Sequence, residues 1–144
     1  MNLSIRQAKP EDAPALYKLC NEAMGYCCTE EQLRSHLLKV MNDPAQAVYV
    51  AEADGNPAGF IHAADYLLLY APPMKNILGL AVSVEFRRLG IGKMLLRAVE
   101  KWAAEDGTAA VRLSSGSQRT ASHEFYRCCG YHNQKMQLCL IKEL

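Results

Sequence analysis

The residues with the clearest chemical potential form a basic, glycine-containing turn at positions 85–96, which reads EFRRLGIGKMLL. An apolar strand-like run ending Val82-Ser83-Val84 precedes the turn, and an apolar helical pattern follows it. Such a turn directs unpaired backbone N–H groups and the positive end of a helix dipole at one spot, which favours an anion. Gly90 and Gly92 let a phosphate oxygen approach the backbone. Three residues add charge and donors: Arg87, Arg88 and Lys93.

Two nucleotide-binding motifs that use such a turn are excluded by spacing. A P-loop requires a glycine where this chain has Arg87, and a serine or threonine where it has Met94. A dinucleotide-binding turn requires a third glycine where this chain has Leu95, and an acidic residue roughly 20 residues further on. Neither an NTPase nor a Rossmann-type site fits the sequence.

A third pattern fits the turn. Arg87, Gly90 and Gly92 fill R-x-x-G-x-G directly after a strand. In this the sequence resembles the GNAT family of acetyl-CoA-dependent N-acyltransferases, whose pyrophosphate loop reads Q/R-x-x-G-x-G/A in the same strand-to-helix context. The resemblance implies acetyl-CoA as co-substrate and an N-acetyltransferase activity.

A second motif lies further along, in the stretch SSGSQRTASHEFYRCCGY. Family members commonly carry a helix that reads N/R-x-x-A-x-x-F/L-Y-x-x-x-G-F/Y. The matching positions are Arg119, Ser122, Phe125, Tyr126, Gly130 and Tyr131. Arg119 stands where many members have asparagine, and Ser122 where most have alanine. The spacing is kept, so the resemblance covers both ends of the expected cofactor site.

The resemblance implies a sheet that splays between the strands at 76–84 and 109–114, with the cofactor in the gap. Backbone groups of Val82 and Val84 would pair with the pantetheine amides as a missing strand would. The pyrophosphate would bind N–H groups from Leu89 to Lys93. The full expected cofactor set is Val82, Ser83, Val84, Arg87, Arg88, Leu89, Gly90, Ile91, Gly92, Lys93, Arg119, Ser122 and Phe125.

Tyr126 is the expected catalytic residue, because the family places a tyrosine here near the CoA sulfur. A phenol with an ordinary pKa of about 10 stays protonated at neutral pH and can protonate the departing thiolate. The general base is left open, since the strand that ends at Val84 carries Asn76 and no carboxylate. Water is the default base, and three further polar candidates remain: His62, His123 and Asp65.

The resulting hypothesis is acetyl transfer from acetyl-CoA to a primary amine by direct attack. A non-catalytic acyl-CoA-binding sensor or partner module is the alternative, because the carboxylate is missing. The acceptor segments MGYCCTEEQ, DYLLLYAPPMK and YHNQKMQ combine aromatic and acidic residues, which would suit a cationic amine. They hold Tyr26, Tyr66, Tyr70, Tyr131, Glu30, Glu31 and Asp65. Small-molecule acceptors, aminoglycoside-like or polyamine-like, and protein amines stay open, as does a homodimer.

The elements that must position these residues can be read along the chain. A strand at 3–8 is followed by a helix from Pro10, and Thr29 with Gln32 marks the start of a second helix. Asp54-Gly55-Asn56 indicates a hairpin. The order is completed by a strand, a helix from the basic turn to Gly107, a strand at 109–114, a helix ending at Gly130 and a closing strand at 134–144.

This mixed pattern predicts an α/β or α+β fold on one central sheet. The expected form is a mixed, mostly antiparallel sheet of about six to seven strands flanked by about four helices, the GNAT fold. The 144 residues, 1–144, fit a single domain. The net charge of +1 gives no field to favour nucleic acid.

No apolar run approaches the ~20 residues of a membrane span, and the N-terminus has no secretory pattern. The six cysteines form no C-x-x-C pair, so no metal site is predicted and the thiols are expected to be reduced. The cytoplasm is the predicted compartment.

Overall fold

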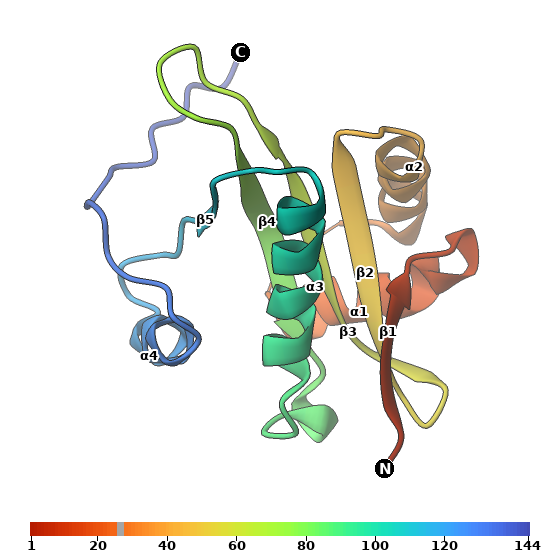
Figure 1. Cartoon of the computed structure of the whole chain (residues 1–144). Helices are drawn as coiled ribbons and strands as arrows, with labels where there is room; N and C mark the ends of the chain where they lie inside the picture. The colour runs from red at the N-terminus through yellow and green to blue at the C-terminus, as the bar shows by residue number, and fades with distance from the viewer. Residues whose placement is uncertain (26–27) are drawn as a thin grey trace. The chain divides into compact units, whose positions relative to one another are not determined.

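The computed structural model describes residues 1–25 and 28–144, which form two compact units, Met1–Ser114 and Ser115–Leu144. Tyr26 and Cys27 lie outside the described residues. The first unit holds, in order, β1 (Leu3–Gln7), α1 (Ala13–Glu22), α2 (Glu30–Met41), β2 (Gln46–Ala53), β3 (Asn56–Tyr66), β4 (Met74–Val82), α3 (Ile91–Glu105) and β5 (Ala110–Leu113) (Figure 1). The second unit holds α4 (Thr120–Cys128).

The sheet has five strands in the order β1-β2-β3-β4-β5. The first four strands pair antiparallel with their neighbours, and β5 pairs parallel with β4. The predicted mixed, mostly antiparallel sheet is therefore confirmed, with fewer strands than expected. Helix α3 crosses from the end of β4 to β5, as a parallel neighbour requires.

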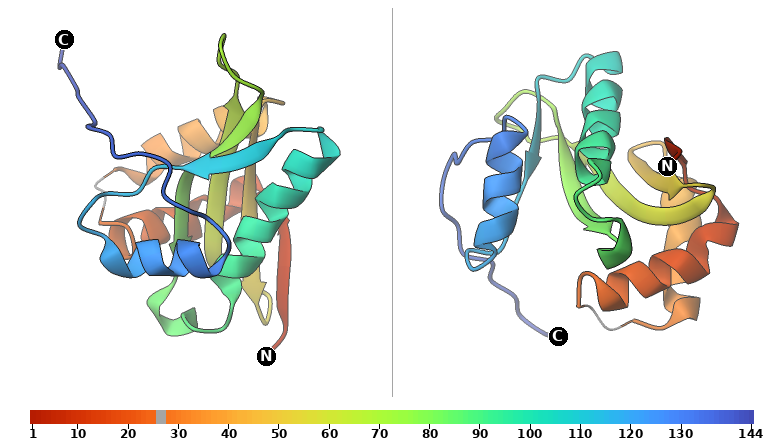
Figure 2. Two further views of the ribbon diagram at one scale, coloured as in Figure 1. Left: turned by 60° about the vertical axis from the view of Figure 1, so that its left-hand side comes forward. Right: turned by 90° about the horizontal axis from the view of Figure 1, so that it is seen from below.

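Helices cover the sheet on both faces. Helix α3 lies on one face, while α1 and α2 lie on the other (Figure 2). On the α1/α2 face the buried cluster includes Leu16, Leu19, Leu37, Val50 and Phe60. On the other face α3 buries Ile91, Leu95, Leu96, Val99 and Ala103, which recur at helical spacing. The position of the functional turn at the start of α3 is thus fixed by a continuous apolar stripe.

Local signals read from the sequence are found where they were predicted. The Thr29 hydroxyl accepts a hydrogen bond from the Gln32 N–H at 3.0 Å and caps α2. Asp54 and Gly55 have φ values of 50° and 83°, as a tight hairpin turn requires, and they join β2 to β3. Both predictions are confirmed.

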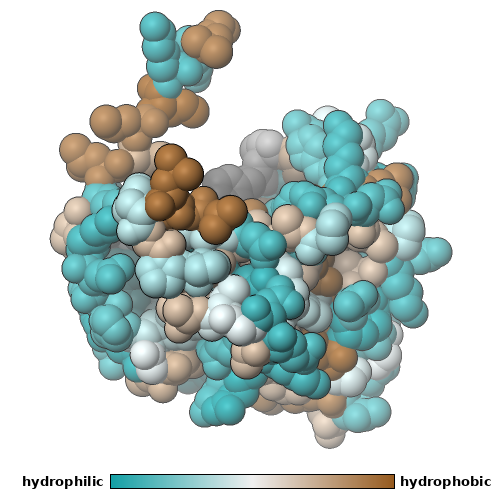
Figure 3. Space-filling view, turned by 45° about the horizontal axis from the view of Figure 1, so that its top comes forward, coloured by the Kyte–Doolittle hydropathy of each residue, from teal (hydrophilic) through white to brown (hydrophobic). Residues whose placement is uncertain are grey.

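The predicted closing strand at 134–144 is wrong. Residues 131–144 form neither helix nor strand, and the large apolar side chains of this segment are almost fully exposed. They are Met136, Leu138, Leu140, Ile141 and Leu144, and apolar side chains of this segment are seen at the molecular surface in Figure 3. An alternating pattern makes a strand only where a neighbouring strand takes its backbone hydrogen bonds, and the five-stranded order includes no such neighbour.

Candidate active site

Strand β4 is divided into two halves by a bulge. Its register with β3 shifts between His62 and Ala63, because His62 pairs with Gly79 and Ala63 pairs with Ile77. Leu78 is therefore the extra residue, and a bulge of this kind bends and twists the strand that carries it. We call Met74–Ile77 the paired half and Leu78–Val82 the free half of β4.

The pairing between β4 and β5 ends next to this bulge. The paired half forms a parallel ladder with β5, which ends at the Ile77 and Leu113 pair. Beyond it, no strand among the described residues pairs with the free half on that side. An unpaired strand edge offers a row of N–H and C=O groups that can bind an extended ligand. The ladder between β4 and β5 therefore ends in the region where the splay was predicted, next to the bulge at Leu78.

The free half leads into the glycine turn. The Ser83 N–H donates to the Ala58 carbonyl at 2.7 Å, and a 3₁₀ turn follows at Val84–Phe86. The chain then reverses through Arg88, with φ of 66°, and Gly90, with φ of 83°. Both residues thus occupy the left-handed region, which a non-glycine residue rarely adopts.

Gly90 is the N-cap of α3, and the Met94 N–H makes the first bond of the helix, to the Gly90 carbonyl at 3.0 Å. The N–H groups from Gly90 to Lys93 therefore precede the first intrahelical bond and point out of the helix end. The Arg87 side chain bends back to the Val82 carbonyl at 3.4 Å. The turn brings together the predicted residues Val82, Ser83, Val84, Arg87, Arg88, Leu89, Gly90, Ile91, Gly92 and Lys93. They surround a helix N-terminus that can bind an anion.

Gly59 on β3 supports the start of α3, and the sequence analysis did not single it out. A Cβ at this position would lie 2.8 Å from the Ala81 carbonyl oxygen and 3.4 Å from side-chain carbons of Ile91 and Leu95. Glycine therefore permits the close approach of the first turn of α3 to the sheet. Its only sequence signal is a glycine within an otherwise apolar strand.

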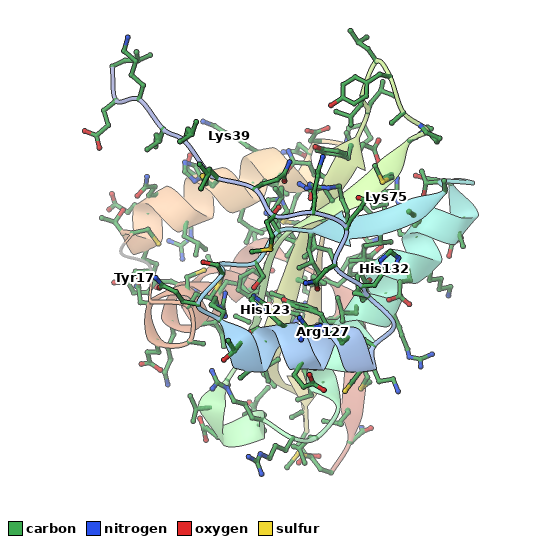
Figure 4. The ribbon with its side chains drawn as sticks, turned by 90° about the vertical axis from the view of Figure 1, so that its left-hand side faces the viewer. Tyr17, Lys39, Lys75, His123, Arg127 and His132 are labelled. Carbon is green, nitrogen blue, oxygen red and sulfur yellow. The ribbon has the colours of Figure 1, made fainter. Side chains whose placement is uncertain are left out.

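Lys75 holds the paired half together, and sequence analysis missed it as well. Its side chain is only 1% exposed, and its Nζ lies 2.5 Å from carboxylate oxygens of both Asp65 and Asp106. The ammonium also lies 3.7 Å from the centre of the Trp102 ring. Burial disfavours the charged ammonium and so lowers the pKa of Lys75. The hydrogen bonds to Asp106 and Asp65 have a larger combined effect, so the pKa is raised overall. The cluster joins β3, β4 and the end of α3, and Figure 4 labels Lys75.

The opposite face of the paired half is polar. Arg112 Nη1 donates to Asn76 Oδ1 at 2.7 Å, and the guanidinium carbon lies 4.5 Å from the centre of the Tyr66 ring. Tyr66 and Asp65 had been expected to suit a cationic amine. Both groups are already engaged by cations of the protein, Tyr66 by Arg112 and Asp65 by Lys75.

The two histidines considered as bases make different contacts. His62 Nε2 lies 2.7 Å from Gln46 Oε1, and burial lowers the pKa of His62, which keeps the imidazole neutral at physiological pH. His123 Nε2 lies 2.8 Å from the Gly116 carbonyl oxygen in the second unit. That contact orders the loop before α4, which agrees with a structural role for His123.

The second unit presents the other predicted residues on one helix. Arg119 is the N-cap of α4, while Ser122, Phe125 and Tyr126 lie within it. Tyr126 is half-buried, and its ring centre lies 5.3 Å from that of Phe125 and 6.2 Å from that of Tyr131. Burial raises the pKa of Tyr126, so its phenol is protonated at neutral pH.

Neither a disulfide bond nor a metal-binding cluster is found among the described residues. Cys20, Cys28, Cys128, Cys129 and Cys139 form no disulfide bond with one another. In residues 1–25 and 28–144, no cluster of histidine, cysteine and acidic side chains could hold a metal ion. Over the same residues, no helix has the length and apolar character that crossing a membrane would require.

The sheet is mixed, and its bulged fourth strand runs through a glycine turn into α3. This arrangement suits an extended, phosphorylated ligand. The model of the Acetyltransferase (GNAT) family matches residues 13–131, and the chain belongs to this family. It is therefore an acetyl-CoA-dependent N-acyltransferase, with acetyl-CoA as co-substrate. This assignment favours an enzyme over a non-catalytic binding module.

Individual relatives give the same picture. The chain is 29% identical over 133 residues to an aminoglycoside N(6')-acetyltransferase type 1 from Stenotrophomonas maltophilia, covering 89% of this chain and 85% of the relative. The structure of AAC(6')-Iy with the bisubstrate analogue CoA-S-monomethyl-acetylneamine is 20% identical, covers 100% of both chains and has a TM-score of 0.87.

An aminoglycoside acetyltransferase from an uncultured soil metagenomic sample, in complex with sisomicin, is 22% identical. It covers 99% of this chain and 96% of its own, with a TM-score of 0.80. At these identities the two solved structures show the shared fold.

Proposed function

We propose that the chain acetylates a primary amine of a small molecule by direct attack of the amine on acetyl-CoA. One observation carries the proposal: the free half of β4 runs without interruption into the turn that ends at Gly90. A linear cofactor with an anionic middle and a thioester at one end matches this order of an unpaired strand edge followed by a helix N-terminus.

In this proposal the pyrophosphate binds the N–H groups from Leu89 to Lys93. Arg87 and Arg88 supply charge at the rim of the turn. Backbone groups of Val82 and Val84, with Ser83 between them, begin the pairing with the pantetheine arm. The free half spans five residues, Leu78–Val82, or about 16 Å at ~3.3 Å per residue. An arm that follows this edge brings its thioester towards the bulge at Leu78.

The chemistry requires few protein groups. The amine nitrogen attacks the thioester carbonyl carbon, a tetrahedral intermediate forms, and the C–S bond breaks to release the CoA thiolate. Tyr126 donates its phenolic proton to that thiolate, and water accepts the proton lost by the amine. The raised pKa of Tyr126 supports the role of an acid that stays protonated until the thiolate forms.

Other roles on α4 follow from the family motif. Arg119, Ser122 and Phe125 contribute to cofactor binding in this proposal. The two compact units would act as one domain, 1–144, because the family match runs across their boundary at Ser114. The cytoplasm stays the predicted compartment, and homodimerisation stays an open prediction.

Aminoglycosides are the acceptor class suggested by the names of the relatives, so they form the first arm of an acceptor panel. Polyamines, amino acids and a lysine-containing peptide form the others, the peptide representing a protein acceptor. Release of free CoA thiol from acetyl-CoA, with the acetylated product identified by mass spectrometry, is the measurement. Absence of amine-dependent thiol release across the panel would contradict the proposal.

Replacement of Tyr126 by phenylalanine tests the proposed acid. We expect kcat to fall about 10²- to 10⁴-fold, the usual contribution of a positioned proton donor, while the affinity for acetyl-CoA stays nearly unchanged. Tyr131→Phe is the matched control, since the Tyr131 ring also packs against Tyr126. Equal losses in both variants, or a parallel loss of acetyl-CoA affinity, would show that the ring only packs.

A further inference from the structure

A row of side chains crosses four strands on the face of the paired half that α3 does not cover. The strand registers align Gln46 on β2 with Ala64 on β3, Ala64 with Asn76 on β4, and Asn76 with Arg112 on β5. We call these four residues the polar row. The pantetheine arm proposed above would end beside this row, because the bulge at Leu78 follows directly on the paired half.

The two faces of the sheet differ at this place. On the α3 face, Ala63, Lys75 and Ile77 are buried. On the face of the polar row, where α1 and α2 also lie, all four residues are partly exposed. Solvent therefore reaches the row itself, whereas α3 covers the opposite face of the paired half.

Arg112 is held in one orientation. Its Nη1 donates to Asn76 Oδ1 at 2.7 Å, its Nη2 donates to Ser114 Oγ at 3.3 Å, and its guanidinium stacks on Tyr66 at 4.5 Å. The bond from Arg112 occupies the amide oxygen of Asn76 and leaves the two N–H groups of that amide as donors. Guanidinium and amide donors therefore lie together at one end of the row.

The hydrogen-bond acceptor groups in and around the row already have partners within the protein. Gln46 Oε1 accepts from His62, and Gln46 Nε2 donates to Asp43 at 2.9 Å. The Asp43 carboxylate also accepts from the Ala45 N–H at 2.9 Å. Asp65 lies on β3 but binds Lys75. The free hydrogen-bonding capacity of the row is thus that of donors with one positive charge, which suits a carboxylate.

We propose that Arg112 and Asn76 bind a carboxylate of the acceptor, so that the acceptor class is small amines that carry a carboxylate. The inference rests on the proposed acetyl transfer and specifies its acceptor. Asn76 lies two residues before the bulge at Leu78, or about 7 Å along the strand at ~3.3 Å per residue. An amine near the bulge and a carboxylate on Arg112 are therefore separated by several bonds, as in an ω-amino acid. Arg112 repels the ammonium groups of a polycation.

Matched acceptors test the inference. The pair 6-aminohexanoate and hexylamine differ in the carboxylate, and we expect the enzyme to prefer the amino acid. In the Arg112→Gln variant, the KM for 6-aminohexanoate should rise about ten- to a hundred-fold, the value of a hydrogen-bonded charge, with little change for hexylamine or acetyl-CoA. Arg97→Gln is the control, since Arg97 is an exposed arginine on α3. Arg112→Lys, which keeps the charge, should restore part of the preference.

The outcomes separate this inference from the proposed function. The enzyme could acetylate both amines, or acetylate aminoglycosides in preference to them. If Arg112→Gln then changes none of the KM values, the carboxylate site is overturned, but the proposed acetyltransferase activity is supported. If no amine is acetylated although CoA binds, the proposed function fails. Calorimetric titration of 6-aminohexanoate into the CoA-bound protein then decides the site, because binding that does not depend on Arg112 overturns it.

Discussion

The two halves of β4 are adjacent in sequence but are stabilised in different ways. The paired half is bonded on both sides, and Lys75 ties it to β3 and to the end of α3. The free half has a partner on one side and begins at a bulge. The paired half therefore provides a rigid support, while the free half keeps backbone groups available for a ligand. Variants that act on one half alone can test this division.

Replacement of Lys75 by alanine should have the largest effect. It removes a buried ammonium from Trp102 and leaves a void, and we expect a loss of about 2–4 kcal/mol in the free energy of unfolding. The lower part of that range is favoured because Asp65 and Asp106 are 47% and 48% exposed and can be hydrated once Lys75 is gone. Urea unfolding followed by circular dichroism measures the change.

Lys75→Met is the matched control, because it keeps the length of the stem and removes the charge. If methionine restores most of the stability, packing against Trp102 dominates; if it does not, the ion pairs dominate. A Lys75→Ala variant as stable as the parent protein would contradict the view that this cluster supports the paired half.

A pair of glycine variants tests the free half and its turn. Gly90 has φ of 83°, so alanine there should destabilise the fold by about 1–2 kcal/mol, with weaker binding of acetyl-CoA. Gly92 is the second residue of α3, where alanine loses less backbone entropy on folding than glycine, so Gly92→Ala should raise the melting temperature.

The proposed phosphate site makes a second prediction for Gly92→Ala. Its added methyl group would lie where the backbone is to meet the pyrophosphate, so the affinity for acetyl-CoA should fall although stability rises. Isothermal titration with CoA and thermal melts of both variants provide the two readouts. Unchanged CoA affinity in both variants would contradict the assignment of this turn to the cofactor.

The sequence predicted most of what local patterns determine. The cap at Thr29, the hairpin at Asp54-Gly55, the apolar stripe of α3 and the glycine turn all depend on neighbours in the chain. The end of the pairing between β4 and β5 could be expected from the family resemblance, but the bulge at Leu78 could not. It depends on the register between β3 and β4, which one strand alone does not reveal.

The features that were missed depend on contacts distant in sequence. Lys75 reads as an exposed charge in its strand, and its burial depends on Asp106 and Trp102, which lie about thirty residues away on α3. Arg112 reads as an ordinary strand residue until the register places it beside Asn76. The segment 134–144 shows the converse error, because its alternating pattern was taken as a strand although no neighbour pairs with it.

The smallest expected effect is a dependence on alkaline pH that belongs to the paired half. The pKa of Lys75 is raised in the folded protein above its ordinary value of 10.5, so the folded state keeps this proton after the unfolded state has lost it. The stabilisation from Lys75 is therefore fully present below pH 10.5 and declines as the pH rises through the folded pKa. The unfolding free energy, measured as the pH is raised above 10.5, should fall more steeply for the parent protein than for Lys75→Met. This variant lacks the titrating group but retains the other lysines and tyrosines. Parallel curves for the two proteins would mean that the carboxylates of Asp65 and Asp106 do not favour the charged form of Lys75, and the support of the paired half would then rest on packing alone.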